Sequence, residues 1–182
     1  QGILEPWDKI KNNAASLGFI NFSEDKDGKL RRIPLLIPYE NSLKPHMAFK
    51  MLLDYLGVDL SELLIQKGKY ISFSDKNNKF YNIPIDDNYQ MLLSWPGAWE
   101  KTFRHISCLD IIQTTAAKKL EGIQSAINPE HYSNAFILIG DTTTASVDVR
   151  PTPFDKRCPL VNVHAVILNQ ILNQYFIRQI PP

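Results

Sequence analysis

Long hydrophobic runs and an excess of charge of one sign are both absent from this sequence. No apolar segment approaches the roughly 20 residues that a membrane-spanning helix needs. The chain carries 20 Lys and Arg residues against 19 Asp and Glu residues, which gives a formal net charge of +1. Because positive and negative charges are nearly equal in number, there is no electrostatic basis for binding nucleic acid or an anionic membrane surface. We therefore expect no nucleic-acid partner.

Motifs that mark enzymes and metal sites are also missing. There is no Gly-x-Ser-x-Gly motif, no glycine-rich phosphate loop and no Cys-x-x-Cys pair, and no two of the four histidines have metal-ligand spacing. The stretch from Asp25 to Gly28 begins like a calcium loop, but Lys29 and Leu36 occupy two of the later ligand positions. We expect no metal and no cofactor, and we interpret this stretch as a turn.

The cysteines, Cys108 and Cys158, are too few to define a disulfide framework. They are compatible with a disulfide in an oxidising compartment, with two free buried thiols, or with one of each. A chain of this size can bury enough apolar surface to fold without a disulfide, so all three arrangements stay open.

A length of 182 residues with 44% hydrophobic and 21% charged residues is typical of one soluble globular domain. No repeat, low-complexity tract or linker divides residues 1–182, so we predict a single domain. Because the chain begins at Gln1 rather than Met and stops just after an apolar helix pattern, we expect it to be a piece of a longer protein. We predict an α/β fold, with mixed α+β as the alternative. It would have a mixed β-sheet with hairpins and helices packed on the sheet.

Turn residues between apolar stretches predict two hairpins. The first joins residues 18–22 to residues 30–37 through the Asp27-Gly28 step, and the second joins residues 69–73 to residues 79–83. Further strands are predicted at residues 90–95 and, as an uninterrupted buried strand, at residues 136–140. Residues 141–160, which contain three prolines, are predicted to form a long loop.

Apolar residues at helical spacing predict three main helices. The first covers residues 45–56, with Pro45 in its first turn and Gly57 as its stop. The second starts at Ser107, where Asp110 completes a capping box, and ends near residue 120. The third covers the apolar positions of residues 165–172.

Polar residues gather after the predicted buried strand. The carboxyl end of such a strand is where open α/β sheets tend to build ligand sites. Thr152 and His164 could fold back to this edge, and Arg31 and Arg32 are possible charge partners. The candidate ligand-binding residues are therefore Asp141, Thr142, Thr143, Asp148, Thr152, His164, Arg31 and Arg32. The alternative interpretation is that the loop residues satisfy backbone groups of their own loop and that the histidine is simply packed.

Short motifs in order along nearly the whole chain resemble those of one family. They are Gly18-Phe19-Ile20-Asn21, Asp25-Lys26-Asp27-Gly28, Arg31-Arg32, Pro34-Leu35, Pro45, Ala48, Ile83-Pro84-Ile85-Asp86, Pro96-Gly97, Ile137-Leu138-Ile139-Gly140, Asp148, Thr152-Pro153-Phe154 and Val163-His164-Ala165. In this order they resemble the CHASE sensory domain of the second type, an extracellular domain associated with cyclases and histidine kinases. His46, Leu160 and Asn162 depart from the pattern, in which Ser, Gly and Glu are usual.

The resemblance implies a non-enzymatic sensory domain that faces the periplasm or the extracellular space, and we expect it to bind an unidentified small molecule or to report on its surroundings. It implies flanking transmembrane helices and a cytoplasmic adenylate or guanylate cyclase, diguanylate cyclase or kinase. It also implies that this chain is the C-terminal two-thirds of a longer domain, whose N-terminal part adds strands and helices. The alternatives are a homodimerisation module without a ligand and a hydrolase that uses Asp141, Asp148 and His164.

Overall fold

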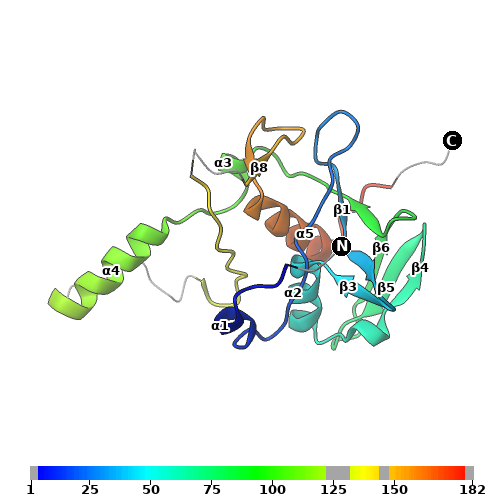
Figure 1. The fold of residues 1–182 in the computed structure, drawn as a ribbon, viewed down its shortest axis with the longest axis horizontal. Coiled ribbons are helices and arrows are strands. Elements are labelled where there is room, and N and C mark those ends of the chain that lie inside the picture. The colour runs from blue at the N-terminus through cyan, green and yellow to red at the C-terminus, as the bar shows by residue number, and fades with distance from the viewer. Residues whose placement is uncertain (1–3, 122–131, 144–147, 179–182) are drawn as a thin grey trace.

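The computed structural model describes residues 4–121, 132–143 and 148–178. It is a mixed α/β domain, which confirms the predicted class (Figure 1). In chain order the elements are α1 (Asp8–Lys11), β1 (Arg32–Pro34), β2 (Leu36–Tyr39), β3 (Ser42–Pro45), α2 (Met47–Leu56), the short 3-10 helix η1 (Leu60–Glu62), β4 (Leu64–Gln66), β5 (Tyr70–Ser74), β6 (Phe80–Pro84), β7 (Gln90–Leu92), α3 (Trp99–Thr102), α4 (Cys108–Glu121), β8 (Val149–Arg150), β9 (Cys158–Pro159) and α5 (Val161–Asn173).

Helices α2 and α5 pack together against the strands and bury the core (Figure 1). Helix α2 ends where the sequence predicts but begins at Met47 rather than at residue 45, because Pro45 is the last residue of β3 and His46 is the N-cap. The Nδ1 atom of His46 accepts a hydrogen bond from the Ala48 N–H at 3.2 Å and so caps the helix. Gly57 ends it in the left-handed conformation, φ +72°.

The second predicted hairpin is confirmed. Strands β5 and β6 pair antiparallel, and β4 extends the sheet on the other side of β5. The turn is held by Asp75, whose Oδ1 accepts hydrogen bonds from the backbone N–H groups of Asn77 at 2.8 Å and Lys79 at 2.9 Å. Asn78 takes the positive φ that this turn requires, +62°.

The first predicted hairpin is wrong, although its turn is present. The Gly28 N–H donates to the Asp25 carbonyl at 2.8 Å, and Gly28 has φ +74°. Residues 18–22 form no strand, and Phe19 makes only an isolated parallel bridge to His46. Strand β1 instead pairs antiparallel with β7, and β2 pairs with β3. The turn residues gave the local bend correctly but carried no information about which strand would be the partner.

Gln170 ties α5 to the β1–β7 ladder from within the core. Its side chain is 1% exposed. Its Oε1 accepts from the Ser94 N–H, and its Nε2 donates to the Leu92 carbonyl, both at 2.8 Å. These bonds satisfy two backbone groups that have no strand partner at the end of β7. Gln170 thereby fixes the position of the last helix against the sheet.

Helix α4 projects from the body of the domain (Figure 1). Ser107 caps it, since its Oγ accepts from the Leu109 N–H at 3.2 Å. Within the predicted loop of residues 141–160, β8 and β9 form a two-residue ladder that the sequence reasoning missed. None of the helices among the described residues has both the length and the apolar character needed to cross a membrane.

Candidate functional site

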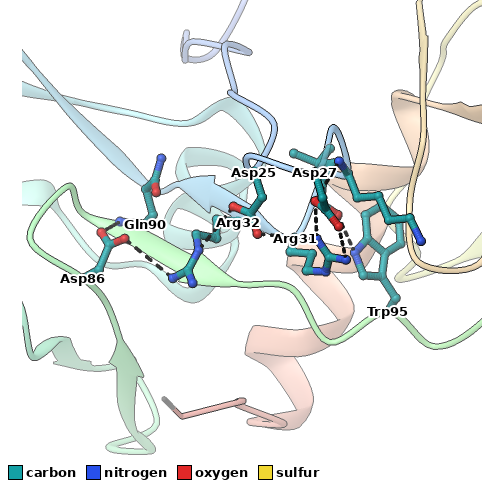
Figure 2. A network of polar contacts seen from close by, with 9 residues as sticks. Asp25, Asp27, Arg31, Arg32, Asp86, Gln90 and Trp95 are labelled. Carbon is teal, nitrogen blue, oxygen red and sulfur yellow. Dashed lines mark hydrogen bonds and ion pairs between the residues drawn. The ribbon is translucent and has the colours of Figure 1, made fainter. Parts of the chain in front are cut away.

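Two adjacent arginines at the start of β1, Arg31 and Arg32, form a network of ion pairs in which both contact Asp25 (Figure 2). Arg31 forms a bidentate pair with Asp27, in which its Nη1 and Nη2 donate to the two carboxylate oxygens, both at 2.7 Å. The hydrogen bond from Arg31 is the main cause that lowers the pKa of Asp27 to about 2. Arg31 therefore closes the turn that precedes β1, and its charge is already used.

Arg32 links that turn to the connection between β6 and β7. Its Nε lies 3.4 Å from the Asp25 Oδ1, and its Nη1 lies 4.0 Å from the Asp86 Oδ2 (Figure 2). The other carboxylate oxygen of Asp86 accepts from the backbone N–H groups of Asn88 at 2.8 Å and Gln90 at 2.9 Å. Arg32 thus stands between two carboxylates that belong to different parts of the fold.

A cleft of about 370 Å³ opens beside Arg32. It lies between the β1–β7 ladder, the β5–β6 hairpin and the segment that follows α5. Its polar wall includes Arg32, Lys69, Asn82, Asp86, Gln90 and Arg178, and Leu92 and Ile177 are among its apolar contacts. Of the predicted site residues, Arg32 lines this cleft and the others do not. Lys69, Asn82 and Arg178 were missed because they are far apart in the sequence and belong to no motif.

The buried strand predicted at residues 136–140 is not observed. Ile137 and Ile139 are 67% and 84% exposed. Phe136 and Leu138 pack against the core, and the Phe136 ring lies 5.0 Å from that of Tyr55 on α2. The segment has alternating exposure without a strand partner among the described residues. The apolar run was interpreted as buried on both sides, whereas only every second side chain is covered.

The polar residues after this segment mostly serve their own loop. Asp141 and Thr143 are exposed, as is Thr142, and the Thr143 N–H donates to the Asp141 Oδ1 at 2.9 Å. Thr152 is buried, and its Oγ1 accepts from the Asp155 N–H at 3.0 Å. The carboxylate of Asp155 in turn accepts from the Trp99 N–H at 2.9 Å. Thr152 therefore anchors the loop to α3.

His164 packs against a second histidine that the sequence reasoning did not connect with it. The rings of His164 and His46 lie 5.1 Å apart. Burial, with a smaller contribution from the neighbouring imidazole of His164, lowers the pKa of His46 to about 3. Burial also lowers the pKa of His164 to about 4, which the negative charge of Asp148 partly opposes. The structure thus brings Asp148 and His164 into each other's electrostatic range, with both imidazoles neutral near pH 7.

Neither the Nε2 of His46 nor the Nδ1 of His164 has a hydrogen-bond partner among the described residues. Among all the residues that the structure describes, no group of three His, Cys, Asp or Glu side chains is arranged as a metal site.

Both cysteines are free thiols, and their surroundings differ. Cys108 is exposed at the first residue of α4, whereas Cys158 is buried. Burial raises the pKa of Cys158 to about 11, although the Asn162 amide, 3.2 Å from its Sγ, acts in the opposite direction. Cys158 is therefore a poor nucleophile, and Cys108 is the accessible thiol.

The sequence is similar to a known protein family over nearly its whole length. The family model described as the CHASE2 domain matches residues 3–182. No curated protein and no solved structure matches the chain.

Proposed function

Since the chain belongs to the CHASE2 domain family, a family of sensory domains, we propose that it is the sensing domain of a transmembrane signalling receptor. The observation that carries this proposal is the family match over nearly the whole chain. In the proposed receptor, the domain lies in the periplasm or outside the cell. Transmembrane helices flank it and connect it to a cytoplasmic cyclase or kinase. The domain itself has no catalytic role.

The cleft beside Arg32 is the proposed ligand site. A ligand changes the output of a receptor only if it binds one signalling conformation more tightly than the other. Arg32 is placed to sense a ligand in this way, because its guanidinium already joins the turn before β1, through Asp25, to the β6–β7 connection, through Asp86. A molecule bound in the cleft beside Arg32 would change the strength of this link, and with it the relation between these two parts of the fold.

The exposed thiol of Cys108 allows a direct test of the location. In intact cells that express the parent receptor, a membrane-impermeant maleimide is expected to label Cys108. The Cys108→Ser variant, which retains only the buried Cys158 within this domain, is the control and should lose this labelling. Labelling of Cys108 that appears only after the cells are lysed would place the domain in the cytoplasm and overturn the proposal.

A second candidate function, homodimerisation, is favoured by one surface. On the projecting helix α4, Leu109 and Ile112 lie one turn apart and are 59% and 64% exposed. Apolar side chains that share a helix face often pack against a partner. If two copies pair through this face, sedimentation velocity should show a concentration-dependent dimer that the double change Leu109→Lys and Ile112→Lys abolishes. A monomer at all concentrations would rule this candidate out.

A further inference from the structure

The cleft beside Arg32 carries more positive than negative charge. Arg32, Lys69 and Arg178 line it together with a single carboxylate, that of Asp86. Among the described residues, neither Lys69 nor Arg178 has a carboxylate within 4.0 Å. Two cations are therefore available to a ligand, and the chemistry that they attract is an anion.

The carboxylate of Asp86 does not cancel this charge, because it is already engaged. Its Oδ1 accepts two backbone hydrogen bonds, from Asn88 and Gln90, and its Oδ2 faces Arg32. Arg32 is in turn shared with Asp25. Arg32 and Asp86 are thus paired within the fold. The negative charge of a ligand would pair with the other two cations, Lys69 and Arg178.

A buried acceptor on β6 defines a second requirement. Along this strand, Tyr81 and Ile83 point into the core, while Asn82 and Pro84 form part of the cleft wall. The Oδ1 of Asn82 is buried and has no hydrogen-bond partner among the described residues. Buried acceptors are nearly always paired, so a ligand donor that reaches this oxygen through a small shift of the cleft wall is favoured over a ligand without a donor.

A ligand that meets both requirements combines negative charge with a hydrogen-bond donor. An ammonium donor would stand among three cations, whereas a hydroxyl group is neutral and is not repelled. Two uncommitted cations suit two carboxylates, and about 370 Å³ is within the range of small-molecule sites. We propose that the cleft binds a small hydroxydicarboxylate, which deepens, and rests on, the sensory function proposed above.

Titration calorimetry of the 182-residue chain at 0.1 M salt tests the ligand class with four probes. Malate has the hydroxyl and both charges, succinate lacks the hydroxyl, dimethyl malate lacks the charges, and inorganic phosphate is an anion without a carbon skeleton. We expect malate to bind most tightly and succinate to bind about tenfold more weakly, which is the effect of one lost hydrogen bond. Dimethyl malate and phosphate should not saturate the site.

Substitutions in the cleft assign the effect to the named side chains. Lys69→Gln and Arg178→Gln should each weaken malate about tenfold, since each removes a charge-assisted hydrogen bond. Both residues are exposed, so these variants retain the fold. Asn82→Leu should reduce malate to the affinity of succinate and leave succinate unchanged. Lys67→Gln is the matched control, because Lys67 is exposed in the same turn but does not line the cleft.

Several outcomes would overturn the proposal: no saturation with any probe, unchanged affinity in both cation variants, or equal affinity for malate and succinate. Phosphate that binds as tightly as malate would show a general anion site instead. If no probe binds while the output of the parent receptor still responds to an external stimulus, the ligand class is wrong and the sensory function is supported. If malate binds as expected but never changes the output, the ligand class is supported and the sensory function is wrong.

Discussion

The buried pair His46 and His164 should make the stability of this domain sensitive to mild acid. Burial keeps both imidazoles neutral in the folded chain, with pKa values of about 3 and about 4, whereas a histidine in the unfolded chain has a pKa near 6.5. Below pH 6.5 the unfolded chain therefore binds protons that the folded chain does not. The stabilisation is fully present above that pH and is lost progressively as the pH falls towards 4 and then 3.

The size of the loss follows from these pKa values. Between pH 7 and pH 5, each histidine lowers the free energy of unfolding by about 2 kcal/mol, so the pair lowers it by about 4 kcal/mol. That is a large part of the free energy of unfolding of a typical domain, which is about 5–15 kcal/mol. Measurements at pH 5 and above keep the titration of Asp27 out of this pH dependence, because its hydrogen bond from Arg31 lowers the pKa of Asp27 to about 2. The contribution of Asp27 is present above its unfolded pKa and is lost only at lower pH.

The assay is urea unfolding at pH 7, 6 and 5, followed by tryptophan fluorescence. His46→Asn removes one titrating ring and retains a side-chain acceptor for the N-terminus of α2. This variant should be less stable than the wild type at pH 7, because it loses the ring contacts with Phe19 and His164. Its further loss between pH 7 and pH 5 should be about 2 kcal/mol rather than about 4 kcal/mol.

His105→Asn is the control, because His105 is an exposed histidine that stacks on Trp99 and does not lie in the core with His46 and His164. It should keep the full pH dependence of the wild type. The reasoning is refuted if the wild type loses less than about 1 kcal/mol between pH 7 and pH 5, or if His46→Asn loses as much as the wild type.

Three further substitutions test other parts of the fold. Gln170→Leu leaves the Ser94 N–H and the Leu92 carbonyl without partners, so urea unfolding should show a loss of roughly 2–4 kcal/mol. Gly18→Ala would place a Cβ 2.5 Å from the Met47 Cα, and thermal unfolding should show a loss of about 1–3 kcal/mol; an unchanged melting temperature would contradict this packing. Asp148→Ala removes the charge that opposes the effect of burial on His164, so NMR titration should give that histidine a lower pKa than in the wild type. If the loop of residues 141–152 lines a ligand site, the same variant should also weaken the response of the parent receptor.

The elements that the sequence predicted are those whose signals are local. Helix α2 has its apolar spacing and its Gly57 stop within a dozen residues, and the β5–β6 hairpin has its turn between its two strands. Strand β7 and helix α5 were likewise marked by short-range patterns. In each case the residues that determine the structure are neighbours in the chain.

What the sequence did not predict depends on contacts between distant residues. The partner of β1 is β7, and nothing in the turn at residues 25–28 specifies it. The cleft combines Arg32, Lys69, Asn82 and Arg178 from four separate segments of the chain, and none of these residues belongs to a recognisable motif. The predicted loop site was inferred from a strand that is not buried, because an apolar run alone does not show which of its faces is covered.

The β1–β7 ladder also has a consequence for how the protein is made. It pairs Arg32 with Leu92, sixty positions later, so it cannot close on the ribosome until β7 has left the exit tunnel. Helix α2 and the β5–β6 hairpin, whose contacts are local, are free to form before then. Arg178 emerges last of all the cleft residues. A nascent chain therefore has most of its scaffold in place before it acquires the second of the two cations that would hold a ligand.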